Sequence, residues 1–251
     1  MTLTLQTFLI VCPLVFLASF VDSIAGGGGL ISLPAYLIAG VPPHHAIASN
    51  KLSSCIGTSI STGRFIKNRL VDMRLGIPAV FLALVGSTIG ARLLLLVDER
   101  YIKYILVIIL PIVAFLVLKR KNFDEDSEGK ISKSKQAVIV FIASFVIGTY
   151  DGFYGPGTGT FLLIIYVQFA KMNLRIAAGN MKLVNLASNF GSLIVFLLHG
   201  EVLLTLGLVA SIFSILGHYI GSGLVMKNGS RIVRPIIMVV LALLFVKILF
   251  W

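Results

Sequence analysis

The sequence predicts an all-α polytopic membrane protein, built from two related halves of opposite topology. Three observations lead to this fold class. Hydrophobic residues make up 57% of the 251-residue chain and charged residues only 12%, whereas soluble domains contain roughly 25% charged residues. The apolar residues gather in runs long enough to cross a bilayer, and a set of motifs occurs twice. An ordinary soluble fold is therefore excluded.

Eight apolar runs predict full spans, because a helix needs about 20 residues to cross the hydrocarbon layer. These runs are 5–24, 46–63, 75–97, 101–118, 136–150, 180–198, 202–225 and 232–250. Two further runs, 30–40 and 159–170, are too short to span and predict half-helices or re-entrant pieces. The first run lacks a positive n-region, and Asp22 stands where a cleavage site is expected, so we interpret it as a retained span.

Residues 119–135 interrupt the apolar pattern. Three basic residues, four acidic residues and three further lysines follow one another there, which is typical of a solvated linker. The linker divides the chain into a first transmembrane repeat, residues 1–118, and a second, residues 136–251.

The two halves share motifs in the same order. Five residues recur 131 positions later: Lys51, Gly76, Gly86, Gly90 and Arg100 return as Lys182, Gly207, Gly217, Gly221 and Arg231. An acidic-glycine motif, Asp22 followed by Gly26–Gly29, returns 129 positions later as Asp151 followed by Gly155-Pro-Gly-Thr-Gly159. Each half contains five hydrophobic pieces, an odd number, so the second half is expected to enter the membrane from the opposite side. Such inverted-topology repeats are typical of secondary transporters.

The distribution of lysine and arginine indicates the orientation. The positive-inside rule places the central linker in the cytoplasm, together with the basic loops at 64–74, 171–175 and 227–234. The loops at 41–45 and 199–201 contain no Lys or Arg and fall outside, as do both termini. The formal net charge of +11 is then explained by topology. Because the aromatic residues lie in apolar runs, no nucleic-acid partner is expected.

Four charged side chains are expected at membrane depth, namely Asp22, Lys51, Asp151 and Lys182. Charged groups there are costly and typically face a cavity, which makes these four the first candidates for function. The lysines are expected to bind an anion. Asp22 and Asp151 are expected either to balance the charge of the lysines or to couple transport to a proton.

Glycines follow both aspartates and have two interpretations. They are expected either to expose backbone N–H groups that bind an anion at the start of the next helix or to let helices pack closely. The candidates for anion binding in the two motifs are Gly27, Gly28, Gly157 and Thr158.

A narrow polar stripe follows each lysine at helical spacing, with the lysine at its N-terminal end. The stripes are Lys51-Ser54-Thr58-Ser61 and Lys182-Asn185-Asn189-Ser192. Either they line an anion cavity, or they hold the helices together by hydrogen bonds. Asn50 and Asn180 precede this pattern and are candidates for substrate binding or for helix caps. His218 stands among apolar residues and is interpreted as a packing histidine.

Motifs of enzymes are absent from the sequence. There is no His-Glu-x-x-His, no Gly-x-Ser-x-Gly, no P-loop and no Cys/His cluster. Cys12 and Cys55 have no metal-ligand spacing. We therefore expect no enzymatic activity, no cofactor and no metal.

The chain resembles the sulfite exporter TauE/SafE family, also called the 4-toluene sulfonate uptake permease (TSUP) superfamily. The resemblance is carried by Asp22 with Gly26–Gly29, Leu33-Pro34, Pro42-Pro43, Ala48-Ser-Asn-Lys-Leu52, Gly152–Gly159 and Asn180–Asn189. Two departures are Ser49, where family members often have Thr, and Met181, which separates Asn180 from Lys182. The resemblance implies a bacterial inner-membrane permease or exporter of small sulfur-containing anions such as sulfite, thiosulfate or organosulfonates, coupled to an ion gradient.

The sequence thus predicts a secondary transporter that moves a small anion across the lipid bilayer by alternating access, with a proton or cation as the coupling ion. The alternatives are a passive anion channel, a membrane scaffold and an intramembrane enzyme.

Overall fold

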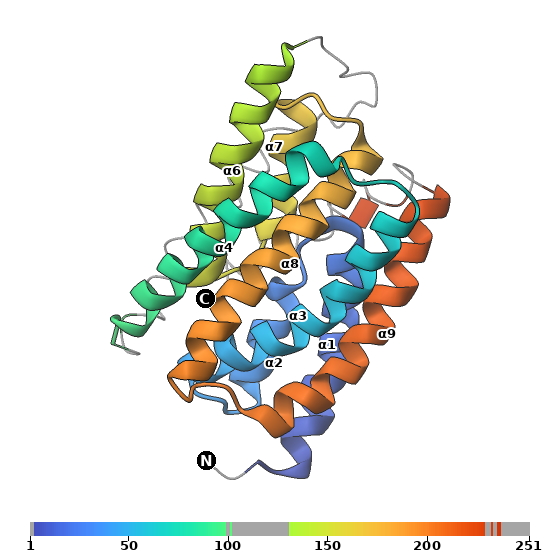
Figure 1. The fold of residues 1–251 in the computed structure, drawn as a ribbon. Helices are drawn as coiled ribbons and strands as arrows, with labels where there is room; N and C mark the ends of the chain where they lie inside the picture. The colour runs from blue at the N-terminus through green and yellow to red at the C-terminus, as the bar shows by residue number, and fades with distance from the viewer. Residues whose placement is uncertain (1–2, 99–100, 102–130, 229–231, 233–234, 237–251) are drawn as a thin grey trace.

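The computed structural model describes residues 3–98, 101, 131–228, 232 and 235–236. Within these residues the chain forms eight helices and no strand (Figure 1). The first half supplies α1 (Leu5–Ala25), α2 (Gly29–Ile38), α3 (Pro43–Lys67) and α4 (Met73–Leu95). The second half supplies α6 (Lys133–Phe153), α7 (Thr158–Gln168), α8 (Leu174–Leu198) and α9 (Leu204–Asn228).

Five of the described helices, α1, α4, α6, α8 and α9, are long and apolar enough to cross a membrane. The predicted run 46–63 lies within α3, which is long enough but carries many polar residues and is not one of the five. The predicted runs 101–118 and 232–250 lie outside the described residues, apart from a few positions at their ends. The described part of the chain is therefore all-helical, and several of its helices are able to span a membrane.

Two of the predicted helix boundaries in the second half are wrong. Helix α6 begins at Lys133, inside the predicted linker 119–135, because Ser132 caps it by accepting a hydrogen bond of 3.3 Å from the Lys135 N–H. The same helix continues to Phe153, so Asp151 lies in its last turn. The apolar run alone does not reveal these polar ends.

The hypothesis that Asn50 and Asn180 cap their helices is also wrong. Helix α3 begins at Pro43, whose fixed φ angle suits the first helical turn. Helix α8 begins at Leu174, where the side chain of Asn173 accepts a hydrogen bond of 3.0 Å from the Arg175 N–H. Both asparagines, and the lysines that follow them, consequently lie well inside a helix and not at its N-terminal end.

The two short apolar runs form the short helices α2 and α7, as predicted. A left-handed glycine precedes each of them, Gly26 with φ +78° and Gly157 with φ +84°, a conformation that L-residues with a Cβ rarely adopt. The two breaks meet in space: the Thr160 hydroxyl donates to the Ala25 carbonyl at 2.8 Å, and a Cβ on Gly26 would overlap the backbone of Gly159. Close backbone approach is thus one function of these glycines.

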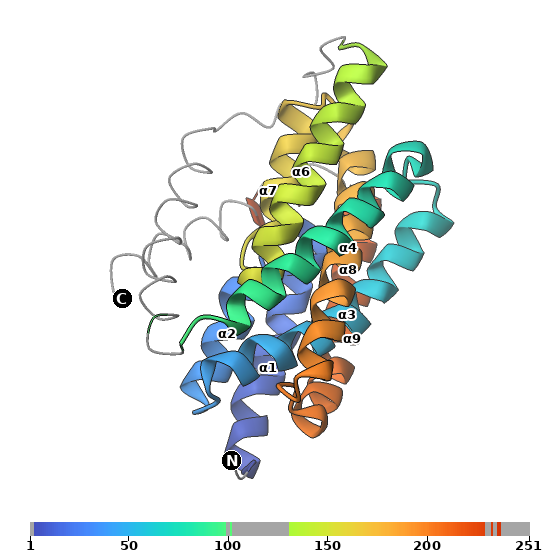
Figure 2. The same cartoon turned by 60° about the vertical axis from the view of Figure 1, so that its left-hand side comes forward.

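The long helices form a row across the molecule. Helices α3 and α8 contact each other at its centre, α9 packs on α3, and α4 packs on α8. At the two ends of the row, α1 packs on α9 and α6 packs on α4 (Figures 1 and 2). Each outer pair thus joins one helix of the first half to one helix of the second half.

Small residues bring these outer pairs close together. A Cβ on Gly90 of α4 would meet the Thr149 carbonyl of α6, and a Cβ on Gly221 of α9 would meet the Phe20 carbonyl of α1. Close contact between backbones through glycine is a common way of packing helices in membranes, where no hydrophobic effect drives them together. The repeated glycines of the sequence therefore mark helix crossings.

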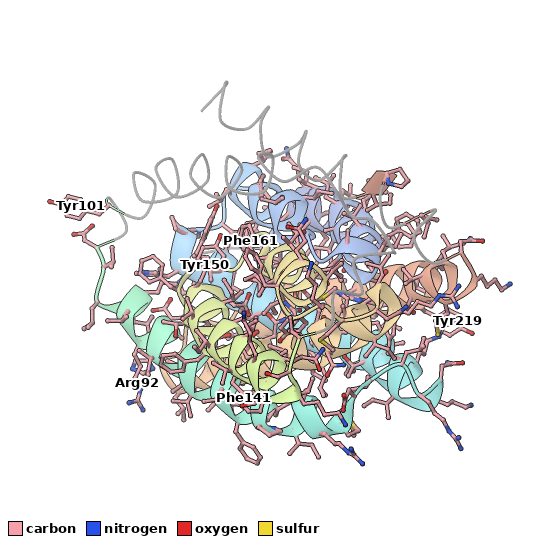
Figure 3. All side chains as sticks on the ribbon, turned by 90° about the horizontal axis from the view of Figure 1, so that it is seen from above. Arg92, Tyr101, Phe141, Tyr150, Phe161 and Tyr219 are labelled. Carbon is pink, nitrogen blue, oxygen red and sulfur yellow. The ribbon has the colours of Figure 1, made fainter. Side chains whose placement is uncertain are left out.

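The outer faces of α4 and α9 are apolar, as a surface in contact with lipid requires. Exposed large side chains occur at every fourth position, at Ile77, Phe81, Val85 and Ile89 on α4 and at Leu208, Ile212, Leu216 and Ile220 on α9. Viewed from above, Arg92 and Tyr219 point outward, whereas the partly buried rings of Tyr150 and Phe161 pack edge to face with centroids 5.8 Å apart (Figure 3).

Candidate functional site

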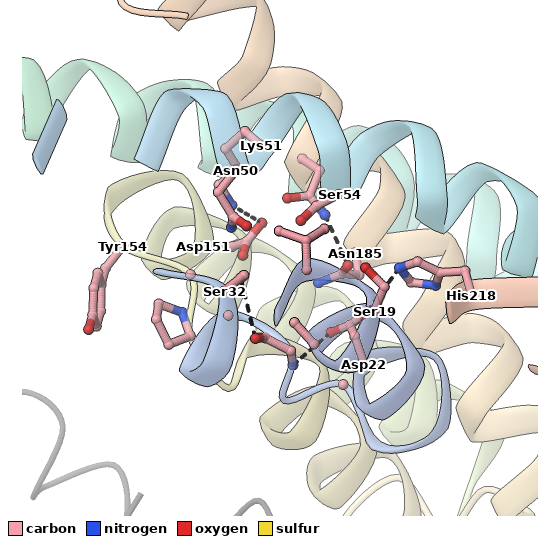
Figure 4. Close-up of a pocket in the computed structure, with 18 residues that line it drawn as sticks. Ser19, Asp22, Ser32, Asn50, Lys51, Ser54, Asp151, Tyr154, Asn185 and His218 are labelled. Carbon is pink, nitrogen blue, oxygen red and sulfur yellow. Dashed lines mark hydrogen bonds and ion pairs between the residues drawn. The ribbon is translucent and has the colours of Figure 1, made fainter. Parts of the chain in front are cut away.

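A cavity lies where the two glycine breaks meet α1, α3, α8 and α9 (Figure 4). Its volume of about 30 Å³ is room for two or three water molecules, at roughly 10–15 Å³ each. The polar residues that line it are Ser19, Asp22, Ser32, Asn50, Lys51, Ser54, Asp151, Tyr154, Asn185, Asn189 and His218. Both halves therefore contribute charged groups to one small, largely polar space.

Lys51 of α3 forms an ion pair with Asp151 of α6. The ammonium nitrogen lies 2.8 Å from Oδ2, and each side chain is 3% exposed. Two hydroxyl groups also donate to this carboxylate, Ser188 to Oδ2 at 2.6 Å and Thr158 to Oδ1 at 2.9 Å. Asp151 is thus a buried carboxylate held by three donors.

Lys182 of α8 forms the second ion pair, with Asp22 of α1. Its ammonium nitrogen lies 2.6 Å from Oδ2 of Asp22 and also donates to the Asp22 carbonyl. The N–H of Gly28 donates to Oδ1 at 3.2 Å. Lys182 is fully buried, whereas Asp22 is 16% exposed and faces the cavity. Each lysine is therefore paired with the aspartate of the other half, and the four charges sum to zero.

His218 of α9 lies beside the second ion pair and has polar neighbours. Its Nδ1 is 3.1 Å from the Ser61 hydroxyl, and its Nε2 is 3.4 Å from the Thr58 hydroxyl and 3.8 Å from Oδ2 of Asp22. The neighbours of His218 along its own helix are apolar, so the sequence suggested packing alone. Two signals were available: His218 directly follows Gly217, a repeated glycine at the crossing with α1, and Ser214 and Ser222 lie four residues before and after it on the same face of α9.

The Ser, Thr and Asn residues of the polar stripes separate into three groups. Ser54, Asn185 and Asn189 line the cavity, and the Asn189 amide donates to Oδ1 of Asn185 at 3.0 Å. Thr58 and Ser61 contact His218 instead. Ser192 donates to backbone carbonyls of its own helix.

The two candidate asparagines occupy different surroundings. Asn50 lines the cavity, and among the described residues its Oδ1 has no hydrogen-bond partner. Asn180 does not line the cavity; its amide donates to the Ile176 carbonyl at 3.0 Å, and its Oδ1 lies close to Gly76 of α4. The inserted Met181 accounts for this difference, because one extra residue rotates a helical position by about 100°.

Of the residues in the glycine motifs that were predicted to bind an anion, only one lines the cavity. Gly28 lines it, but its N–H already donates to Asp22. Gly27 and Gly157 are not among the lining residues, and the hydroxyl of Thr158 donates to Asp151. Sequence reasoning missed three polar lining residues, Ser19, Ser32 and Tyr154, and interpreted a fourth, His218, as a packing histidine. Of these, Tyr154 lies inside the second glycine motif, which was a usable signal.

Comparison with known proteins decides the family. The family model described as "Sulfite exporter TauE/SafE" matches residues 11–248. The chain belongs to the TauE/SafE family. It is 37% identical over 238 residues to "Probable membrane transporter protein YfcA" of Escherichia coli K12, a match that covers 93% of this chain and 86% of that protein.

Two further relatives of this TauE/SafE protein carry similar names. "Probable membrane transporter protein ORF9" of Sinorhizobium sp is 35% identical over 237 residues, covering 93% of this chain and 89% of that protein. A "Probable membrane transporter protein" of Haemophilus influenzae is 35% identical over 236 residues, covering 94% of this chain and 91% of that protein. No solved structure matches the chain significantly. The family and the helical fold together make this protein a membrane transporter.

Proposed function

We propose that this protein is a secondary transporter of a small anion, which binds in the cavity between Lys51 and Lys182. The observation that carries the proposal is the presence of two buried lysines, one from each half, whose ion pairs flank a single cavity. Buried cations in a membrane protein usually mark a solute or ion pathway. The family description names sulfite, which supports a small sulfur-containing anion as the substrate class, and we include thiosulfate and organosulfonates in this proposal.

Electrostatics determines what binding requires. An anion about 4 Å from a lysine gains about 4 kcal/mol at an effective dielectric constant of about 20. An aspartate at a similar distance repels the anion by a comparable amount. Since Lys51 and Lys182 each contact an aspartate, an anion binds well only when at least one aspartate moves away or loses its charge.

We further propose that the halves form an inverted repeat and that the anion is moved by alternating access. The helix pairing supports this, because α1 packs on α9 as α6 packs on α4. The loops support it as well: left-handed residues occur at Gly40 and Lys171, and again at Arg69 and Gly200, each pair 131 positions apart. The two ion pairs are also related by the repeat, because each joins the lysine of one half to the aspartate of the other. Rocking of one half against the other would therefore separate both pairs.

The orientation we propose is that of a bacterial inner-membrane protein with the linker 119–135 in the cytoplasm and both termini outside. The Lys/Arg distribution supports this orientation. It is tested in a chain free of Cys12 and Cys55 by adding one cysteine in a loop. A membrane-impermeant maleimide applied to intact cells is expected to label Glu201→Cys and not Asn68→Cys; the reverse result contradicts the orientation.

Binding is tested first. The purified protein is heated with sulfite, thiosulfate, sulfate, sulfoacetate or taurine, and the shift in unfolding temperature is measured. A ligand at 100 times its Kd stabilises the folded state by about 2.7 kcal/mol, so a substrate is expected to stand out. No shift with any anion contradicts the proposal.

Transport is tested in proteoliposomes with the anion that binds. Uphill accumulation driven by an ion gradient is expected, whereas equilibration alone indicates a channel. Lys51→Ala and Lys182→Ala are expected to lower flux at least tenfold. Lys67→Ala, which removes an exposed lysine at the end of α3, is the matched control and is expected to transport normally. If both lysine variants fold and transport at the parental rate, the binding site is assigned wrongly.

A further inference from the structure

The two ion pairs differ in how their carboxylates are satisfied. Asp151 accepts from Lys51, Ser188 and Thr158 and is 3% exposed. Asp22 accepts from Lys182 and from one backbone N–H, and its side chain is 16% exposed at the cavity wall. Asp22 is therefore the carboxylate with free acceptor capacity on the cavity side.

A histidine accompanies only this second pair. His218 lies 3.8 Å from Oδ2 of Asp22, a gap that one bridging water or a small side-chain rotation closes. The repeat-related position on α4, 131 residues earlier, is Ser87, whose hydroxyl donates to the Leu84 carbonyl of its own helix at 3.1 Å. A titratable histidine therefore lies at the cavity beside Asp22, whereas the repeat-related residue, Ser87, is not among the residues that line the cavity.

The other charged groups that face Asp22 come from few elements. Lys182 on α8 contacts it directly, while Lys51 on α3 and Asp151 on α6 form their own pair across the cavity. Helices α2 and α7 contain no charged residue, and the one charged residue of α9, Lys227, is exposed in its last turn. Among the described residues, a proton arriving at Asp22 thus changes the balance of charge chiefly around Lys182 and His218, its two nearest titratable neighbours.

The geometry points to Asp22 and His218 as the site of a coupling proton, a conclusion that rests on the proposed anion transport. One proton from the bulk solution adds to the Asp22 carboxylate, with His218 as the neighbouring group that passes it on. The neutral Asp22 releases the ammonium group of Lys182, which then pairs with the anion. For a monovalent anion the loaded and empty sites carry the same net charge, so no uncompensated charge is buried.

The surroundings of Asp22 favour a proton over a metal cation. Sodium and other hard cations require several oxygen ligands. The groups on the Asp22 carboxylate are the Lys182 ammonium, the Gly28 N–H and the ring of His218, all of which present nitrogen atoms. Among the described residues the carboxylate is thus arranged to receive a hydrogen bond or a proton.

Proton uptake on binding tests the inference without any substitution. The probes are thiosulfate, sulfate and methanesulfonate, which do not take up protons near neutral pH themselves. Purified protein in weakly buffered solution with a pH indicator dye is expected to take up about one proton for each anion bound. Anion binding without proton uptake would overturn the inference and leave the proposed function intact. Sulfite is added as a fourth anion. If none of the four anions binds, both the inference and the proposed function are overturned.

Variants then locate the proton in proteoliposomes. Asp22→Asn and His218→Gln are expected to lower accumulation driven by a pH gradient at least tenfold more than they lower anion–anion exchange, which needs no net proton movement. A purely structural defect would lower both modes together and overturn the assignment. His199→Gln, at the exposed end of α8, is the matched control and keeps both modes. Accumulation of the anion driven by a sodium gradient, with equal pH on both sides, would also overturn the assignment of a coupling proton.

Discussion

Lys51 and Asp151 form an ion pair between α3 and α6, with 2.8 Å between the ammonium nitrogen and Oδ2. The lysine comes from the first half of the chain and the aspartate from the second. The repeat-related pair of Lys182 and Asp22 joins the halves in the opposite sense. Both pairs therefore cross the boundary at which a transporter with two rocking halves would open.

Removing one partner of a buried ion pair is expected to be costly. Lys51→Ala leaves the Asp151 carboxylate without its counter-charge and is expected to destabilise the protein by about 3–5 kcal/mol. The double variant Lys51→Met with Asp151→Leu is expected to recover most of that loss, because it buries no charge. Denaturant titration in detergent measures the stability, with Lys67→Ala as the control.

The double variant also separates stability from transport. It is expected to fold and yet to lose anion flux at least tenfold in proteoliposomes, since one cation of the cavity is gone. A double variant as unstable as the single one contradicts the stability argument. One that transports at the parental rate contradicts the role of Lys51.

The contact between the glycine breaks predicts a sharp response to a single methyl group. Gly26→Ala places a Cβ against the backbone of Gly159 at a residue with φ +78°. The combined clash and backbone strain are expected to cost at least about 2 kcal/mol. Gly63→Ala, at a helical position with open space around it, is expected to stabilise the protein by about 0.5–1 kcal/mol. Equal unfolding temperatures for the two variants would contradict the close approach.

The two outer helix crossings, α4 on α6 and α9 on α1, are expected to lose similar stability when a glycine is replaced by alanine. Gly90→Ala forces α4 away from the Thr149 carbonyl, and Gly221→Ala forces α9 away from the Phe20 carbonyl and the Ser23 hydroxyl. Each is expected to cost about 1–3 kcal/mol from overpacking, measured by thermal unfolding. A clear loss of stability from one substitution and none from the other would contradict the matched packing of the two crossings.

Arg64 near the end of α3 ties this helix to α9. Its guanidinium lies 4.3 Å from the centroid of the Tyr219 ring and donates to the Tyr219 carbonyl and the Ser222 hydroxyl. Arg64→Ala is expected to cost about 1–2 kcal/mol, whereas Arg74→Ala, at an exposed site in the first turn of α4, is expected to be neutral. A double-mutant cycle with Tyr219→Ala is expected to give a coupling of about 0.5–1 kcal/mol; zero coupling refutes the ring contact.

Much of the fold was predictable because it depends on local composition. The short helices α2 and α7 followed from the length of their apolar runs, and the breaks before them from their glycines. The starts of α3 and α8 were missed because Pro43 and Asn173 lie outside the apolar runs used to set the boundaries. Polar capping residues belong to a helix without contributing to its hydropathy.

The sequence by itself determined that the chain is rich in apolar runs, that a set of motifs occurs twice and that the chain belongs to the TauE/SafE family, and it predicted that two lysines and two aspartates lie at membrane depth. These properties follow from hydrophobicity, spacing and motifs along the chain. Only the tertiary structure decided that each lysine pairs with the aspartate of the other half and that His218 lies beside Asp22. Lys182 and Asp22 are 160 residues apart, and such contacts depend on how α1, α8 and α9 pack against one another, which no local pattern encodes.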